Sequence, residues 1–117
     1  EARWWWTARA NAMRDSGLLS QAIEIYLIGI ERFPNFSHMY FELAWAYKLN
    51  HQFAEAALYI DKAIALMEAP KLYYYLRAGE IYEEMGEKEK ALQFYKIALQ
   101  IDPLNESALR GLERVND

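Results

Sequence analysis

Apolar residues recur along this chain at spacings of three and four, which is the period of one face of an α-helix. Tyr40, Leu43, Ala44 and Tyr47 illustrate this spacing near the middle of the chain. Glycine and proline interrupt the pattern at intervals, because glycine suits the left-handed backbone after a helix and proline cannot continue one. The pattern predicts an all-α protein with helices over residues 3–15, 19–33, 37–49, 53–67, 72–85, 88–101 and 105–115.

The helical pattern repeats with a period of 34 or 35 residues. Trp6, Tyr40 and Tyr75 share one position of this repeat, and Gly17 and Gly86 share a turn position where His51 stands in the middle copy. The other shared positions are Ala10, Ala44 and Gly79; Met13, Tyr47 and Tyr82; Ala22, Ala56 and Ala91; Tyr26, Ile60 and Tyr95; and Gly29, Ala63 and Ala98. Small residues at several of these positions let two helices pack closely, so each copy predicts a helix pair.

This pattern resembles the tetratricopeptide repeat, which is written W-x₂-L-G-x₂-Y, then A-x₃-F, then P. The third copy carries the motif most fully, with Tyr75, Gly79, Tyr82, Gly86, Ala91, Tyr95, Ala98 and Pro103. The resemblance implies an α-solenoid of three antiparallel helix pairs and a single domain over residues 1–117. Its repeats would span about 3–36, 37–71 and 72–105, and residues 106–117 would form the capping helix that such arrays need.

Composition and charge restrict the classes of function that are open to this chain. The net charge is −4 and the isoelectric point is about 5.2, whereas a nucleic-acid binder usually has a basic surface. The apolar runs are much shorter than the ~18 residues of a membrane span, so no membrane insertion is expected. There is no cysteine, which excludes disulfides and thiolate metal sites. Because the chain begins with Glu1 rather than Met, we expect a fragment of a longer protein.

The resemblance also implies a peptide-binding groove, since the first helix of each pair faces the concave side of such a solenoid. Aromatic residues and arginine are the usual anchors of peptide interfaces. The predicted groove residues are Trp4, Asn11, Phe41, Trp45, Tyr73 and Arg77. The alternative for each ring is that it only packs against neighbouring helices.

Some members of this family hold the acidic tails of heat-shock chaperones in a carboxylate clamp of two lysines, two asparagines and one arginine. Asn11 and Arg77 match clamp positions. Thr7 and Tyr73 stand where the lysines belong, and Glu42 replaces the second asparagine. We expect Glu42 to repel a carboxylate, which argues against chaperone-tail binding.

The repeat register places the three adjacent tryptophans on different sides of the first predicted helix. Trp4 faces the groove, and Trp6 takes a core position inside the first repeat. Trp5 takes the position that packs on a preceding repeat, so its partner must be a residue before Glu1, another domain or a second copy of the protein. Trp5, Arg9 and Ala12 therefore form a candidate assembly face, and a homo-oligomer is one way to cover it.

The sequence gives little support for a catalytic function. The sequence shows no nucleophile motif and no Gly-rich phosphate loop, so we expect no enzyme in this chain and no cofactor. His38 and Glu42 lie four residues apart on one helix, but no third metal ligand is apparent. Two functions remain: a module that captures a protein or peptide partner in the groove, or a structural element that assembles through its N-terminal face. An appendage to a catalytic domain elsewhere in the parent chain is compatible with both.

Overall fold

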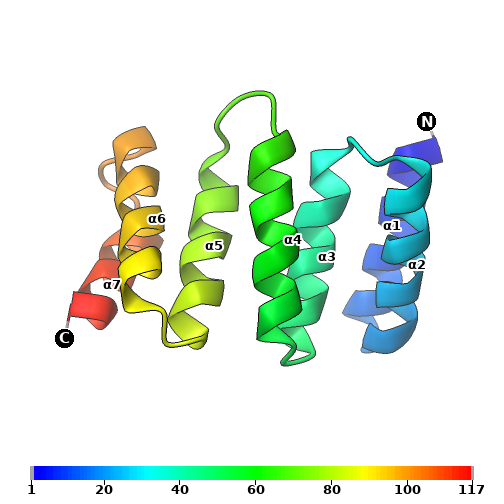
Figure 1. Ribbon diagram of the computed structural model, residues 1–117, viewed down its shortest axis with the longest axis horizontal. Coiled ribbons are helices and arrows are strands. Elements are labelled where there is room, and N and C mark those ends of the chain that lie inside the picture. The colour runs from blue at the N-terminus through cyan, green and yellow to red at the C-terminus, as the bar shows by residue number, and fades with distance from the viewer. Residues whose placement is uncertain (1, 117) are drawn as a thin grey trace. The chain divides into compact units, whose positions relative to one another are not determined.

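The computed structural model describes residues 2–116, and these form seven α-helices in chain order (Figure 1). Their bounds are α1 Ala2–Asp15, α2 Leu19–Arg32, α3 Ser37–Leu49, α4 Phe53–Leu66, α5 Leu72–Glu84, α6 Lys88–Ile101 and α7 Glu106–Asn116. Every predicted helix is confirmed, and its ends differ from the prediction by one residue at most. Glu1 and Asp117, the ends of the predicted domain, lie outside the described residues.

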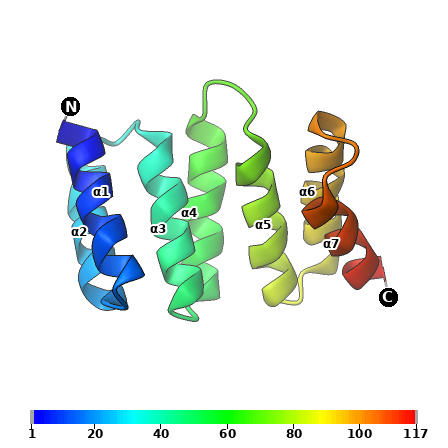
Figure 2. The same ribbon diagram turned by 180° about the vertical axis from the view of Figure 1, so that it is seen from behind.

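The chain divides into two compact units, unit 1 (Glu1–Met67) with α1 to α4 and unit 2 (Glu68–Asp117) with α5 to α7. In unit 1, α1 pairs with α2, α3 pairs with α4, and α2 also packs against α3. Figures 1 and 2 show α1 and α3 on one face of unit 1, with α2 and α4 on the other. In unit 2, α6 packs against both α5 and α7, and α5 also contacts α7. The prediction that residues 1–117 form one domain stays a prediction.

The turn inside each helix pair has the same geometry in all three copies. The backbone N–H of Leu18 donates to the Met13 carbonyl at 2.9 Å, and Gln52 and Glu87 donate to the equivalent carbonyls at the same distance. The residue just before each of these donors has a positive φ: 86° at Gly17, 59° at His51 and 79° at Gly86. Glycine adopts this conformation without strain, whereas His51 pays the steric cost of a β-carbon there.

Aromatic stacking fills the inside of the second and third helix pairs. The Tyr59 ring of α4 lies 5.5 Å from Tyr47 and 6.3 Å from Tyr40, measured between ring centroids. In the third pair, Phe94 stacks on Tyr82 at 5.6 Å and on Tyr75 at 6.3 Å. The agreement of these distances confirms the repeat register deduced from sequence.

Trp6 takes the equivalent position in the first pair but is only partly buried. The guanidinium of Arg32 lies over its ring at 5.1 Å, and Trp5 meets it edge to face at 5.5 Å. The core prediction for Trp6 is therefore confirmed only in part. The first pair offers Met13 and Ile25 where the others have stacking rings, so its core contains fewer aromatic contacts.

Candidate functional site: an aromatic cluster and a polar network on unit 1

An aromatic cluster forms where the N-terminal part of α1 meets the start of α3. It consists of Trp4, Phe36, His38 and Phe41. Trp4 contacts Phe36 edge to face at 4.8 Å and lies 5.3 Å from the His38 ring. His38 in turn stacks on Phe41 at 6.2 Å. The structure thus joins Trp4 and Phe41, two predicted groove residues, through His38 at the start of the second repeat.

The members of this cluster differ sharply in exposure. Half of the Trp4 surface is exposed (50%), whereas only 7% of Phe41 is. Phe41 therefore supports the cluster from inside, as the packing alternative anticipated for an individual ring. Trp4 presents a large indole face to the surroundings. An exposed aromatic group held in place by other rings is a typical anchor for a peptide side chain.

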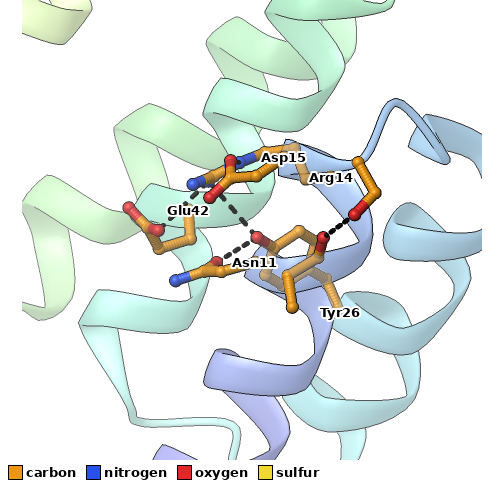
Figure 3. Close-up of polar contacts among 7 residues, drawn as sticks. Asn11, Arg14, Asp15, Tyr26 and Glu42 are labelled. Atoms are coloured by element: carbon orange, nitrogen blue, oxygen red, sulfur yellow. Dashed lines mark hydrogen bonds and ion pairs between the residues drawn. The ribbon is translucent and has the colours of Figure 1, made fainter.

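A polar network lies between α1, α2 and α3 (Figure 3). The Tyr26 hydroxyl donates to the Asn11 side-chain oxygen, and Arg14 donates to the Tyr26 hydroxyl at 3.3 Å. The same guanidinium nitrogen of Arg14 donates to the Glu42 carboxylate at 3.1 Å, and its Nε donates to Asp15 at 3.2 Å. The network fixes the Asn11 oxygen toward Tyr26.

This network bears on the electrostatic role predicted for Glu42. Only 10% of the Arg14 side chain and 13% of the Glu42 side chain are exposed, so the pair is mostly desolvated. Burial by itself lowers the pKa of Arg14, but the Tyr26 hydroxyl and the Glu42 carboxylate outweigh that effect and raise it. The expectation that Glu42 repels a ligand carboxylate stays a prediction, and its premise is weaker because Arg14 compensates much of the charge of Glu42.

The remaining predicted groove residues divide between the two units. On unit 1, the Lys48 ammonium lies 4.6 Å from the centroid of the partly buried Trp45 ring. On unit 2, Tyr73 is 70% exposed, and a guanidinium nitrogen of Arg77 lies 3.8 Å from the Glu80 carboxylate. Unit 1 therefore holds Trp4, Asn11, Phe41 and Trp45, and unit 2 holds Tyr73 and Arg77.

Two residues of the site, Phe36 and Arg14, were not predicted from the sequence. Phe36 falls between the aligned helical segments, where the repeat pattern says nothing about neighbours. Its position directly before a helix that carries His38 and Phe41 was the available signal. Arg14 is not among the predicted groove residues. Its pairing with Glu42 joins residues 28 apart in sequence, so no local pattern reveals it.

The candidate assembly face lies along one side of α1. Trp5 is 54% exposed, and Arg9 and Ala12 are exposed as well. The Arg9 guanidinium lies 5.5 Å from the Trp5 ring centroid, which aligns the two side chains along the helix. The three residues thus form one continuous surface of unit 1.

Metal ligation and membrane insertion find no structural support within the described region. Residues 2–116 contain no group of three or more His, Asp or Glu side chains arranged to hold a metal ion. His38 instead belongs to the aromatic cluster, and Glu42 to the polar network. Of the helices described, none combines the length and apolar character needed to cross a bilayer.

Comparison with known proteins identifies the fold. The sequence model of the tetratricopeptide repeat matches residues 72–105. No curated protein matches the chain in sequence. The first tetratricopeptide-repeat domain of Spaghetti (RPAP3), solved with the HSP90 peptide SRMEEVD, superposes with a TM-score of 0.91 at 24% identity, covering 97% of this chain and 90% of that one.

Two further solved structures agree. The second such domain of human RPAP3, bound to the HSP70 peptide SGPTIEEVD, gives a TM-score of 0.89 at 24% identity, with 96% of this chain and 92% of that chain covered. The Arabidopsis OM64 domain gives 0.89 at 23% identity, with 98% and 94% covered. The seven helices of residues 2–116 fit three tetratricopeptide repeats and a capping helix.

Proposed function

We propose that this member of the tetratricopeptide repeat family is a protein–protein interaction module that captures a peptide or extended segment of a partner in an aromatic-lined groove. The observation that carries the proposal is the aromatic cluster, where Trp4 is half exposed and is held by Phe36 and His38. A preordered ring costs little side-chain entropy when a ligand binds. An apolar or proline side chain of the partner suits this surface.

Each groove residue has a role in this proposal. Trp4 anchors the peptide, and Phe41 supports the anchor through His38. Asn11 turns its oxygen to Tyr26, which leaves its amide nitrogen to donate to a carbonyl of the peptide backbone. Trp45 extends the contacts along the partner within unit 1. The assignment of Tyr73 and Arg77 of unit 2 to the groove stays a prediction.

The similar solved structures support a peptide as the class of partner, because two of them hold chaperone-derived peptides. This chain lacks the lysines of the carboxylate clamp. Thr7 is 2% exposed and donates its hydroxyl to the Arg3 carbonyl at 2.7 Å, so it offers nothing to a carboxylate. We therefore propose a partner recognised by apolar side chains rather than by a terminal carboxylate.

The groove can be tested with a peptide selected from a random 12-residue display library and titrated by fluorescence anisotropy. Replacing Trp4 by alanine should weaken binding by about tenfold or more, as expected for a central anchor. Trp5→Ala is the matched control, because Trp5 is equally exposed on another side of α1, and its affinity should be unchanged. Selection of no binder, or equal loss in both variants, would contradict the proposal.

The peptide SRMEEVD separates this proposal from chaperone-tail binding. We expect weak binding or none, because the two lysine positions of the clamp are Thr7 and Tyr73. Micromolar affinity that disappears in Arg77→Ala would show that a carboxylate clamp operates here despite those substitutions. Calorimetric titration of the peptide into the wild type and into Arg77→Ala provides the measurement.

A further inference from the structure

A polar cavity lies within unit 2. Its volume is about 270 Å³, and it is lined by Glu80 of α5, Tyr95 of α6, and Ser107, Arg110 and Arg114 of α7. The walls therefore come from three helices that pack on one another. Sites for whole small molecules usually begin at about 300 Å³, so this cavity suits one side chain of a larger partner.

The walls of the cavity have counterparts in the predicted groove of unit 1. Arg110 and Arg114 stand two repeat periods after Phe41 and Trp45, which are predicted groove residues. The same register positions thus carry aromatic rings in unit 1 and guanidinium groups in unit 2. Equivalent positions with different chemistry select different ligand groups, and those of unit 2 select a charged one.

The α7 side of the cavity supplies hydrogen-bond donors. Arg114 donates from its Nε and Nη2 to Glu83 at 2.8 and 3.1 Å, and its Nη1 carries two further N–H groups. Ser107 adds a hydroxyl in the first turn of α7, where the helix dipole favours a negative group. Arg110 lies one turn from each of them, so the three side chains share one face of the helix. This donor set fits an oxyanion, either a carboxylate or a phosphate.

The charge balance makes Arg110 the cation that a ligand can reach at least cost. A nitrogen of Arg110 lies 3.8 Å from the Glu106 carboxylate, but the two side chains are 71% and 82% exposed, and such pairs contribute little. Glu80 opposes an anion, yet an Arg77 nitrogen lies 3.8 Å from its carboxylate and offsets part of its charge. An anion that replaces Glu106 beside Arg110 therefore gains an ion pair at small cost.

We propose that this cavity binds the acidic side chain of a peptide partner, with Arg110 as the main cation and with Arg114 and Ser107 as hydrogen-bond donors. The proposal rests on the proposed function for the peptide as the class of partner. None of the cavity residues belongs to the Trp4 cluster or to the clamp positions. The module thereby gains a charged binding site whose chemistry differs from that of the aromatic one.

The test uses three small probes: acetyl-glutamate methylamide, acetyl-phosphoserine methylamide and, as the neutral match, acetyl-glutamine methylamide. Each is titrated at constant ionic strength into the ¹⁵N-labelled protein, and the amide signals of Ser107 and Arg110 are followed by NMR. At least one acidic probe should saturate these signals at millimolar concentration and bind about fivefold or more tightly than the glutamine probe. The acidic probe that binds more tightly identifies carboxylate or phosphate as the preferred group. No saturation, or equal binding of acidic and neutral probes, would overturn the proposal. These probes carry no apolar anchor, so the result is independent of the Trp4 test.

Three variants assign the roles within the cavity. Arg110→Gln should weaken the acidic probe about threefold to tenfold, and its helices should persist because the side chain is 71% exposed. Arg9→Gln is the matched control, since it removes an exposed arginine from unit 1, and it should leave the affinity unchanged. Glu80→Gln should strengthen binding about twofold to fivefold, because it removes a like charge from the wall. Equal effects of the two arginine variants, or weaker binding by Glu80→Gln, would overturn the proposal.

Discussion

Tyr26 in unit 1 and Tyr95 in unit 2 occupy the same position of the first and third repeats, yet their hydroxyls meet side chains of opposite charge. The Tyr26 hydroxyl accepts from Arg14 and donates to Asn11. The Tyr95 hydroxyl donates to Glu83 at 2.7 Å. Arg14 and Glu83 hold equivalent positions on the first helix of their repeats. Burial raises the pKa of both tyrosines, and the Glu83 carboxylate adds to this effect at Tyr95.

In each unit, an ion pair then joins the first helix of the repeat to the helix that follows the pair, and the charges are exchanged between the two units. In unit 1, Arg14 of α1 pairs with Glu42 of α3. In unit 2, Glu83 of α5 pairs with Arg114 of α7, with nitrogen–oxygen distances of 2.8 and 3.1 Å. In the first and third repeats, the buried hydroxyl thus has a polar partner and a charged pair joins two helices, although the signs of the charges are exchanged.

The two ion pairs differ in how much water they meet. The Arg14 and Glu42 side chains are 10% and 13% exposed, whereas those of Arg114 and Glu83 are 52% and 26% exposed. Screening by solvent weakens an exposed pair, and a mostly buried pair becomes costly when one member is removed. The variants below test this contrast, beginning with the largest expected effect.

At both sites, loss of the buried tyrosine ring should reduce the stability of the protein more than loss of the ion pair. Tyr95 is 1% exposed, and its replacement by alanine should destabilise the protein by about 3–5 kcal/mol, as for other buried aromatic residues. Tyr73→Ala is the matched control, since Tyr73 is 70% exposed and its loss should leave the melting temperature nearly unchanged. Urea denaturation followed by circular dichroism measures both. Equal losses would mean that the burial of Tyr95 does not determine stability here.

Close packing around Tyr95 can be tested from the neighbouring helix. A β-carbon on Gly79 would lie 2.6 Å from the Tyr95 ring, and one on Gly111 of α7 would lie 2.4 Å from it, so the ring is held between two glycines. Gly79→Leu should overpack this space and cost about 1–3 kcal/mol. Gln93→Leu adds the same side chain at an exposed position of α6 and should cost little. A Gly79→Leu protein that melts like the wild type would contradict the register.

The contrast in exposure predicts unequal ion-pair effects. Glu42→Gln should cost about 1–3 kcal/mol, because the mostly buried Arg14 then keeps only the exposed Asp15 as an ionic partner. Arg114→Gln should cost about 0–1 kcal/mol, because Glu83 still reaches water and accepts from Tyr95. Chemical denaturation of the two single variants gives the comparison directly. A larger loss for Arg114→Gln would reverse our ranking of the two sites.

Acidification should reveal how much the Arg114–Glu83 ion pair of unit 2 contributes to stability. We expect this contribution to be smaller than that of the Arg14–Glu42 pair. Hydrogen bonds from Arg114, and also from Tyr95, hold the pKa of Glu83 below the ordinary carboxyl value of 4.5. A carboxyl whose pKa is lowered by folding stabilises the protein above its unfolded pKa, and this contribution disappears as the pH falls through the folded pKa. Between pH 7 and pH 3, the wild type should therefore lose more thermal stability than Arg114→Gln. Identical pH profiles would show that this pair contributes nothing to acid sensitivity.

The sequence by itself determined the helices, their repeat register and the positions of the turns. These follow from local rules, namely apolar spacing along one chain segment and a left-handed residue at the end of a helix, as at Gly17 and Gly86. The same register correctly placed Trp4 and Trp5 on exposed sides of α1. Local periodicity suffices for such predictions because neighbouring helical positions have fixed angular relations.

Only the tertiary structure decided which side chains meet across helices. Arg14 pairs with Glu42 of α3, a contact that the expectation for Glu42 did not include. Phe41 lies beneath His38 with 7% exposure, and Phe36 supports Trp4 from outside the aligned pattern. A repeat register states which face a residue occupies. The length, direction and charge of the neighbouring side chains decide whether that residue is buried, paired or left at the surface, because packing satisfies several helices at once.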